Sequence, residues 1–353
     1  MGLIVLAIHL PKNDALNYSF YEIVLRSDST PNSNFFEKEE TEKDYNLTYG
    51  WNDYGNNNFS ISFAISKGQL AEAEKEFGYY SEEFKKYLDE SSKLMTREMI
   101  EYLKDFARQE IAKSRYSQYI QVVDSSPDQF NLKLSAPATL EDKVKAEFKN
   151  VSEKIFKKRE SYLKKISKQL KKKSQEYFEK RGIRTIGNKI EVDYDFCIQK
   201  NRPRLEHVFQ LMKELKPKLN IYQFLGIMLA FVQEIKYLSL PSEENKKLIL
   251  EFWVPPKVLV NNGGDCDSKA ATFATLWTHL KSYPVVLIKI QSHILIGVAV
   301  PSHGEAGFII HGLRCTLCEV AGPGKMPPGL IHQYSWMHLK NKSFRYQLIK
   351  SVR

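Results

Sequence analysis

The first part of the chain alternates between hydrophobic and polar positions in the manner of short β-strands. Residues 18–25 and 59–65 show this alternation, and a polar loop rich in Asn, Asp and Glu lies between them. From about residue 68 to 115 the apolar residues recur at helical spacing, which predicts two helices packed as a hairpin. A further strand-like pair follows within residues 119–134. The pattern therefore predicts a mixed α/β region over residues 1–138, whose role the sequence does not indicate.

The next segment, residues 139–200, predicts one long amphipathic helix to about residue 180 and then a linker strand. One stripe of this helix is apolar, and lysines occupy the remaining faces. The apolar stripe consists of Phe148, Val151, Ile155, Tyr162, Ile166, Leu170 and Tyr177. Three interpretations stay open: a scaffold helix with solvated lysines, a coiled-coil helix that pairs with another chain, and a basic surface for nucleic acid or anionic lipid.

The positive charge of the chain is concentrated in this helix. The full sequence holds 52 Lys and Arg residues against 42 Asp and Glu residues, a formal net charge of +10. Residues 143–181 alone contain 15 basic and 5 acidic residues, so the rest of the chain is nearly neutral. A partner attracted by charge is therefore expected at residues 143–181, as a partner helix or an anionic surface. The composition as a whole does not single out a nucleic-acid-binding protein.

Hydropathy and cysteine content bear on where the protein resides. The opening eight residues are apolar, but the run is too short for a membrane span and lacks the basic start of a signal peptide, so it predicts a strand. No transmembrane segment is expected. A cytoplasmic location is the expectation, with an exported protein whose signal has been removed as the alternative. Four cysteines in 353 residues do not indicate a disulfide framework.

Residues 261–277 carry the most informative motif of the sequence. The run Asn-Asn-Gly-Gly-Asp-Cys-Asp predicts a glycine loop that opens a helix, with Asp265 as the N-cap and Cys266 in the first turn. The helix dipole and the free backbone N–H groups at this position favour a thiolate and supply oxyanion donors. Cys266 is therefore the candidate nucleophile.

A cysteine nucleophile needs a base and a group that orients the base. Residues 283–300 predict two buried strands in succession, and His293 stands at the start of the second. Glu319 directly follows a third predicted strand, at residues 308–318. A carboxylate there would accept the ring N–H of His293 and fix its tautomer. We therefore predict that Cys266, His293 and Glu319 form a catalytic triad.

At these residues the chain resembles the transglutaminase-like superfamily, a papain-related set of cysteine enzymes, and in particular its microbial cysteine-peptidase branch. The family pattern is a Gly-Asp-Cys motif at a helix start, followed by a His and an Asp or Glu on successive strands. Residues 264–267 match the first part, and Glu319 stands where Asp is commoner. Further segments that look like family motifs, in the same order, are residues 231–237, 253–259 and 318–324. The resemblance lies within residues 203–334 and does not extend to residues 1–200.

The resemblance implies an α+β fold in which residues 201–353 form a papain-like catalytic lobe of helices against an antiparallel sheet. It also implies a cysteine hydrolase, a peptidase or amidase, that acts on peptide or protein amides. Cys266 would attack the carbonyl, His293 would protonate the leaving amine, and a thioester would form. Gln233 is the candidate side-chain oxyanion donor, with a helix-surface amide as the alternative.

Two other functions stay open. One is a transglutaminase-type acyltransferase that uses an amine acceptor, and the other is a non-catalytic partner-binding module on a papain-like scaffold. Neither a cofactor nor a metal is expected, although a calcium site built from Asp265 and Asp267 stays open. Cys315 and Cys318 invite a zinc interpretation, but on a strand they point to opposite faces, and the sequence has no second Cys-x-x-Cys motif.

Overall fold

The computed structural model describes residues 34–350, except 127–128, 216–218, 301–306 and 322–323. The strands expected at residues 1–8 and 18–25 lie outside the described residues. Within them the fold is mixed α+β, as predicted, and its larger sheets are antiparallel. None of the helices in this described part is both long and apolar enough to cross a membrane.

The chain folds as two compact units, and the second is inserted into the first. Unit 1 combines the chain up to residue 78 with the chain from residue 190 onward, and unit 2 comprises residues 79–189. These boundaries differ from the predicted domains 1–138, 139–200 and 201–353. The reason is that the first strands pack on later helices: the buried Trp51 donates from Nε1 to the backbone oxygen of Ile227, at 3.2 Å. Alternation predicted that these strands have a buried face but did not indicate what covers it.

Unit 1 begins with an antiparallel meander of three strands, which confirms the strand predicted at residues 59–65. The meander and the helix after it are β1 (Phe35–Glu40), β2 (Asp44–Asn52), β3 (Asn58–Ser66) and α1 (Lys67–Glu76). The later helices of the unit are α4 (Tyr194–Asn201), α5 (Glu206–Glu214), α6 (Ile221–Glu234), α7 (Pro255–Asn261), α8 (Cys266–Trp277) and α9 (Gln333–Lys340). The two-residue strands are β9 (Lys236–Tyr237), β10 (Glu243–Glu244), β11 (Lys247–Leu248) and β12 (Gly263–Gly264).

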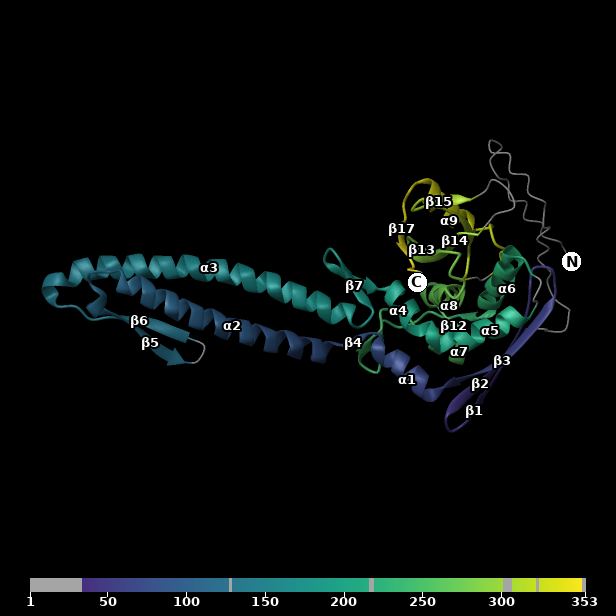
Figure 1. Ribbon diagram of the computed structural model, residues 1–353, viewed down its shortest axis with the longest axis horizontal. Coiled ribbons are helices and arrows are strands. Elements are labelled where there is room, and N and C mark those ends of the chain that lie inside the picture. Colours follow the sequence, from purple (N-terminus) through teal and green to yellow (C-terminus); the bar gives the residue numbers. More distant parts are fainter. Residues whose placement is uncertain (1–33, 127–128, 216–218, 301–306, 322–323, 351–353) are drawn as a thin grey trace. The chain divides into compact units, whose positions relative to one another are not determined.

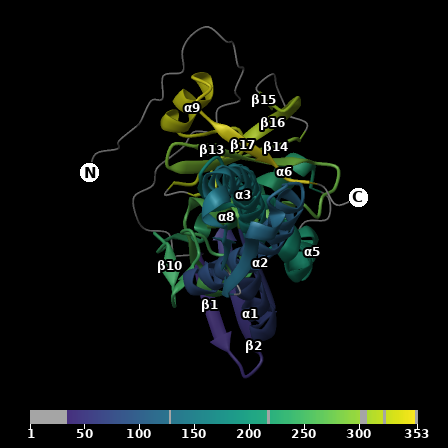
Figure 2. The same cartoon turned by 90° about the vertical axis from the view of Figure 1, so that its left-hand side faces the viewer.

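A five-stranded antiparallel sheet forms the second half of unit 1. Its order is β15-β16-β14-β13-β17. The strands are β13 (Val285–Ile290), β14 (His293–Val298), β15 (Phe308–Ile310), β16 (Leu313–Cys318) and β17 (Arg345–Leu348). Side chains such as Val286 and Leu295 on one face pack with Leu339 of α9, while α8 packs against the opposite side, next to β14 (Figure 2). Helix α8 therefore lies directly beneath the strand that starts with His293.

Unit 2 is built around two long helices that lie side by side (Figure 1). They are α2 (Ser81–Ala112) and α3 (Glu141–Glu179), and the antiparallel strands β5 (Ile120–Ser126) and β6 (Gln129–Leu134) lie between them in sequence. The short strands β4 (Tyr79–Tyr80), β7 (Ile183–Ile186) and β8 (Lys189–Val192) lie near the ends of the unit in sequence. Met95, Met99 and Leu103 of α2 form a core with Ile166 of α3.

The helices of unit 2 correct one expectation. The pattern over residues 68–115 does contain two helices, α1 and α2, but they belong to different units and do not form the predicted hairpin. Helix α2 pairs with α3 instead, because the apolar stripe predicted on α3 requires a long partner. The hairpin of α2 and α3 is called the arm below.

Candidate active site

The loop before α8 is shaped by close packing around two glycines. Helix α7 ends at Asn262, whose φ of 44° turns the backbone into the left-handed region. Strand β12 then pairs in parallel with β9. A Cβ on Gly263 would lie only 2.2 Å from Cδ1 of Leu238, so no larger residue fits without displacing that side chain. Asp265 accepts a hydrogen bond from the Ser268 N–H at 2.9 Å, and α8 begins at Cys266, as predicted.

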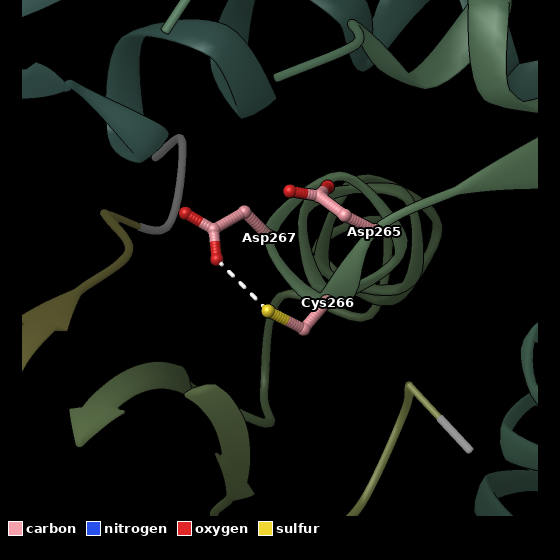
Figure 3. Close-up of side chains that lie close together, drawn as sticks. All are labelled: Asp265, Cys266 and Asp267. Atoms are coloured by element: carbon pink, nitrogen blue, oxygen red, sulfur yellow. Dashed lines mark hydrogen bonds between the residues drawn. The ribbon is translucent and has the colours of Figure 1, made fainter. Parts of the chain in front are cut away.

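Cys266 is held by the residue that follows it. Its side chain is almost fully buried, with 9% exposed, and Sγ donates to Oδ1 of Asp267 at 3.2 Å (Figure 3). The other oxygen of Asp267 accepts a hydrogen bond from the Tyr194 hydroxyl and lies 4.0 Å from Nζ of Lys289. Three elements, α8, α4 and β13, therefore meet at this carboxylate.

These surroundings oppose the thiolate that the helix start favours. Burial raises the pKa of Cys266 far above its ordinary value, and the charges of Asp267 and Asp265 raise it further. The backbone N–H of Ile294 acts in the opposite direction but does not compensate. In this arrangement desolvation and two carboxylates therefore favour the protonated thiol, against the effect of the helix N-terminus. The contact with Ile294 also places the sulfur at the start of β14, next in sequence to His293.

His293 and Glu319 form the pair that the sequence predicted. Nε2 of His293 lies 2.6 Å from Oε2 of Glu319, which follows the last residue of β16. The other carboxylate oxygen, Oε1, accepts from the Ser335 hydroxyl at 2.6 Å and from the His332 N–H at 3.1 Å. Glu319 is 5% exposed. With Nε2–H donated to Glu319, a neutral His293 ring keeps Nδ1 unprotonated as a proton acceptor.

The electrostatics of Glu319 suit this orienting role. Burial alone would raise the pKa of its carboxyl, but the hydrogen bonds from His293 and Ser335 outweigh burial and leave the pKa below its ordinary value. Glu319 is therefore an anion at neutral pH. Within the described residues, no hydrogen bond joins Cys266 to His293: the thiol bonds to Asp267 and the imidazole to Glu319.

Gln233 lies at the site but its amide is fully engaged. Nε2 donates to the backbone oxygens of Glu319, at 2.6 Å, and Met326, at 2.9 Å. Oε1 accepts from the Tyr54 hydroxyl at 2.8 Å and from the Met326 N–H at 3.2 Å. Both amide hydrogens are therefore used, and this geometry gives the predicted oxyanion role no support. It places Gln233 as an anchor of the segment that carries Glu319.

The donor atoms of Asp265, Cys266 and Asp267 lie within 4.8 Å of one another, close enough for a cation. Proximity is the only observation in favour of a metal, because Asp265 caps α8 and Asp267 already accepts from Tyr194 and Cys266. Burial and the charge of Asp267 raise the pKa of Asp265 to about 6. Cys315 and Cys318 are buried free thiols of β16 whose sulfurs face backbone carbonyls.

Sequence reasoning missed the contacts that surround the three predicted residues. The sequence places Asp267 next to Cys266 but does not indicate that its carboxylate is the partner of the thiol. Ser335 and Tyr194 lie far from the motif in sequence, and no local signal marks them. Comparison of the chain with family models, with curated proteins and with solved structures found no match in any of the three.

Proposed function

We propose that the protein is a cysteine hydrolase that cleaves peptide or protein amides through Cys266, His293 and Glu319. The observation that carries the proposal is the 2.6 Å pair between His293 and a buried Glu319, whose second oxygen is itself anchored by Ser335. A histidine held this way keeps one tautomer and one orientation, as acyl transfer requires. The packing of α8 beneath an antiparallel sheet supports the resemblance to papain-related enzymes.

The proposed reaction starts when the Cys266 thiol turns away from Asp267 toward Nδ1 of His293. The imidazole accepts the thiol proton, and Glu319 stabilises the imidazolium that forms. The thiolate attacks the substrate carbonyl, and the backbone N–H of Cys266 at the start of α8 is a donor for the oxyanion. His293 returns the proton to the leaving amine, which departs as the thioester forms. Water, deprotonated by His293, then attacks the thioester and releases the acid and the free thiol.

The proposal is tested with a peptide mixture and a peptidyl acyloxymethyl ketone, which alkylates an activated cysteine. The wild type is expected to hydrolyse peptides and to be labelled at Cys266 alone, as located by mass spectrometry. Cys266→Ser abolishes both, and His293→Ala lowers the labelling rate by about 10²–10⁴. Cys197→Ala and His311→Ala are matched controls, since Cys197 is a buried free cysteine of α4 and His311 contacts Tyr346.

Each outcome of this experiment selects one function. Addition of an amine acceptor such as glycinamide distinguishes the acyltransferase: amide product in place of acid would favour a transglutaminase-type reaction. Labelling of Cys266 that does not depend on His293, together with absent hydrolysis, would overturn the hydrolase and leave a partner-binding module on a papain-like scaffold.

We also propose a binding role for the arm, as a surface for a partner helix. Helix α3 contains a seven-residue repeat in which an apolar residue precedes two lysines: Phe156-Lys157-Lys158, Leu163-Lys164-Lys165 and Leu170-Lys171-Lys172. Phe156 and Leu163 are 56% and 39% exposed, although the core face of α3 packs on α2. A spacing of seven places Phe156 and Leu163 on one flank of the helix, as in a coiled-coil seam, whereas Leu170 is partly buried and packs against the core between α2 and α3. The flanking lysines favour a partner helix whose own seam is flanked by Asp and Glu.

The probe for this surface is a synthetic helical peptide with leucines at heptad spacing flanked by glutamates. We expect the full chain to bind it with an affinity that falls as salt rises, and Phe156→Ser/Leu163→Ser to abolish binding. Leu94→Ser is the matched control, because Leu94 is an exposed leucine of α2. Equal binding to the same peptide with lysines in place of glutamates would contradict the proposal.

A further inference from the structure

Lys269 is a buried cation one turn beyond the nucleophile. It lies on α8, three residues after Cys266, and only 1% of it is exposed. Among the described residues, no carboxylate forms an ion pair with it. A lysine without a carboxylate partner is rarely buried so completely, since desolvation penalises the charge. The buried ammonium group therefore needs hydrogen-bond acceptors that compensate for the loss of solvation.

Those contacts are three backbone carbonyls from two separate segments. Nζ donates to Ile235 at 2.6 Å, to Ala321 at 2.9 Å and to Gln233 at 3.4 Å. A lysine ammonium has three N–H donors, so the set uses all of them. Gln233 and Ile235 stand at the end of α6, where the carbonyls lack helical partners and the helix dipole favours a cation.

The carbonyl of Ala321 connects Lys269 to the segment that carries Glu319. Ala321 lies two residues after Glu319, and the backbone oxygen of Glu319 accepts from the Gln233 side chain at 2.6 Å. Lys269 and Gln233 therefore hold the same short segment by two of its carbonyls, one from α8 and one from α6. The three elements that carry Cys266, Gln233 and Glu319 all meet at this ammonium group.

We propose that Lys269 is a positioning residue for the triad, which sets the distance between the nucleophile on α8 and the His293–Glu319 pair through its bond to Ala321. The inference rests on the proposed cysteine chemistry. Lys269 does not face the reacting atoms, so it acts through the segment of Glu319 and not on the substrate. Burial lowers the pKa of Lys269 to about 8, although the charge of Glu234 acts in the opposite direction.

The experiment measures alkylation of Cys266 by iodoacetamide across pH in the full chain, alongside the thermal midpoint. Lys269→Met keeps the length of the side chain and removes its donors. We expect the His293-dependent alkylation rate of the folded variant to fall about 10- to 100-fold, as misplacement of a catalytic group by about 1 Å does. Lys269→Gln retains two N–H donors, is expected to recover part of the rate, and replaces Lys269→Met if that variant does not fold.

Control variants separate this inference from the function on which it rests. If His293→Ala alkylates like the wild type, no activated pair exists, and the proposed function and the role of Lys269 both fail. If the wild type depends on His293 and folded Lys269→Met keeps the same rate and pH profile, only the role of Lys269 fails. A lower thermal midpoint with an unchanged profile would likewise assign Lys269 a purely structural role. Thr275→Val is the matched control, because Thr275 is a buried polar residue of α8 that bonds only within its helix.

Discussion

The hydroxyl of Tyr194 donates a hydrogen bond to Asp267, the same carboxylate that accepts one from the Cys266 thiol. Tyr194 is buried, and Nζ of Lys289 lies 4.0 Å from the same carboxylate. These two contacts hold Asp267 as an acceptor beside the sulfur. This contact and the raised pKa of Cys266 favour the protonated thiol. In the proposed reaction, the sulfur leaves Asp267 and turns to His293.

The first prediction concerns Asp267→Asn. The charge of Asp267 raises the pKa of Cys266, so the neutral amide is expected to lower it. The pH midpoint for alkylation of Cys266 should shift down by about one unit or more. Mass-resolved alkylation rates between pH 6 and pH 10 measure this shift, because below the midpoint the rate rises in proportion to the thiolate fraction. Asp105→Asn on α2, which removes an exposed ion pair with Arg108, should leave the midpoint unchanged. An unchanged midpoint in Asp267→Asn itself would show that the thiol does not sense this carboxylate.

The second prediction concerns Glu319→Gln. A neutral amide cannot stabilise the imidazolium and no longer fixes one tautomer of His293, so the labelling rate of Cys266 should fall about 10²–10⁴-fold. Rates with the peptidyl ketone at pH 7 measure the loss. Glu244→Gln is the control, because Glu244 is a partly buried carboxylate paired with Lys257. A Glu319→Gln rate within about threefold of the wild type would remove Glu319 from the triad.

The third prediction is a pH dependence of stability that also comes from Glu319. Its pKa is lowered in the folded state, so the folded protein binds this proton less readily than the unfolded chain does. The stabilisation is present above the ordinary pKa of Glu and is lost as pH falls through the folded value. Urea midpoints of wild type and Glu319→Gln should therefore converge as the pH is lowered from 7 toward 3. A constant difference over that range would contradict the prediction.

The fourth prediction separates the cap of α8 from its charge. Asp265→Ala removes the hydrogen bond to the Ser268 N–H and should destabilise the protein by about 1 kcal/mol. Asp265→Asn keeps an acceptor at the same place and should retain most of the stability. It also removes a carboxylate that raises the pKa of Cys266, so its thiol should alkylate at lower pH than the wild type. Denaturant unfolding and alkylation measure the two effects on the same samples.

The fifth prediction tests whether the N-terminal strands belong with the candidate site. Trp51 is 1% exposed and donates to Ile227 of α6, so Trp51→Ala should destabilise unit 1 by about 3–5 kcal/mol. Trp336→Ala on α9, where 36% of the side chain is exposed, should have a much smaller effect. Unfolding followed by intrinsic fluorescence and by protection of Cys266 reports on unit 1. An independent N-terminal domain would unfold on its own and leave Cys266 protected.

Local patterns predicted local features well. Strict alternation located the strand at residues 59–65, and helical spacing located α3 and its apolar stripe. The glycines and Asp265 predicted the start of α8 at Cys266, and the order of motifs predicted the pair of His293 and Glu319. Each of these follows from residues close together or from a known order of elements. The division of the chain into two units could not be predicted in this way. The meander packs on α6 through contacts between distant parts of the chain.

The sequence around Lys269 contains a signal that this lysine is buried. It is followed on α8 by residues that are small or apolar apart from two threonines and that include no other charge, a pattern typical of a buried helix. A lysine in such a helix must find acceptors inside the protein. Which acceptors it finds depends on where α6 and the segment after β16 end, and the sequence does not indicate that. The contact between Asp267 and the Cys266 thiol likewise joins neighbours in sequence. Its geometry depends on Tyr194, which lies on another helix.

The insertion of unit 2 has a consequence for how the chain is made. Trp51 and its acceptor on α6 are 176 residues apart, and the arm lies between them. At about 5–20 residues per second, the ribosome delivers α6 roughly 10–35 s after the meander has been synthesised. During this interval β2 lacks α6, the helix that packs against it, while the arm folds from contacts within its own length. Nascent chains halted before residue 221 are therefore expected to bind chaperones through the meander, and chains halted after α6 has emerged are expected to be released.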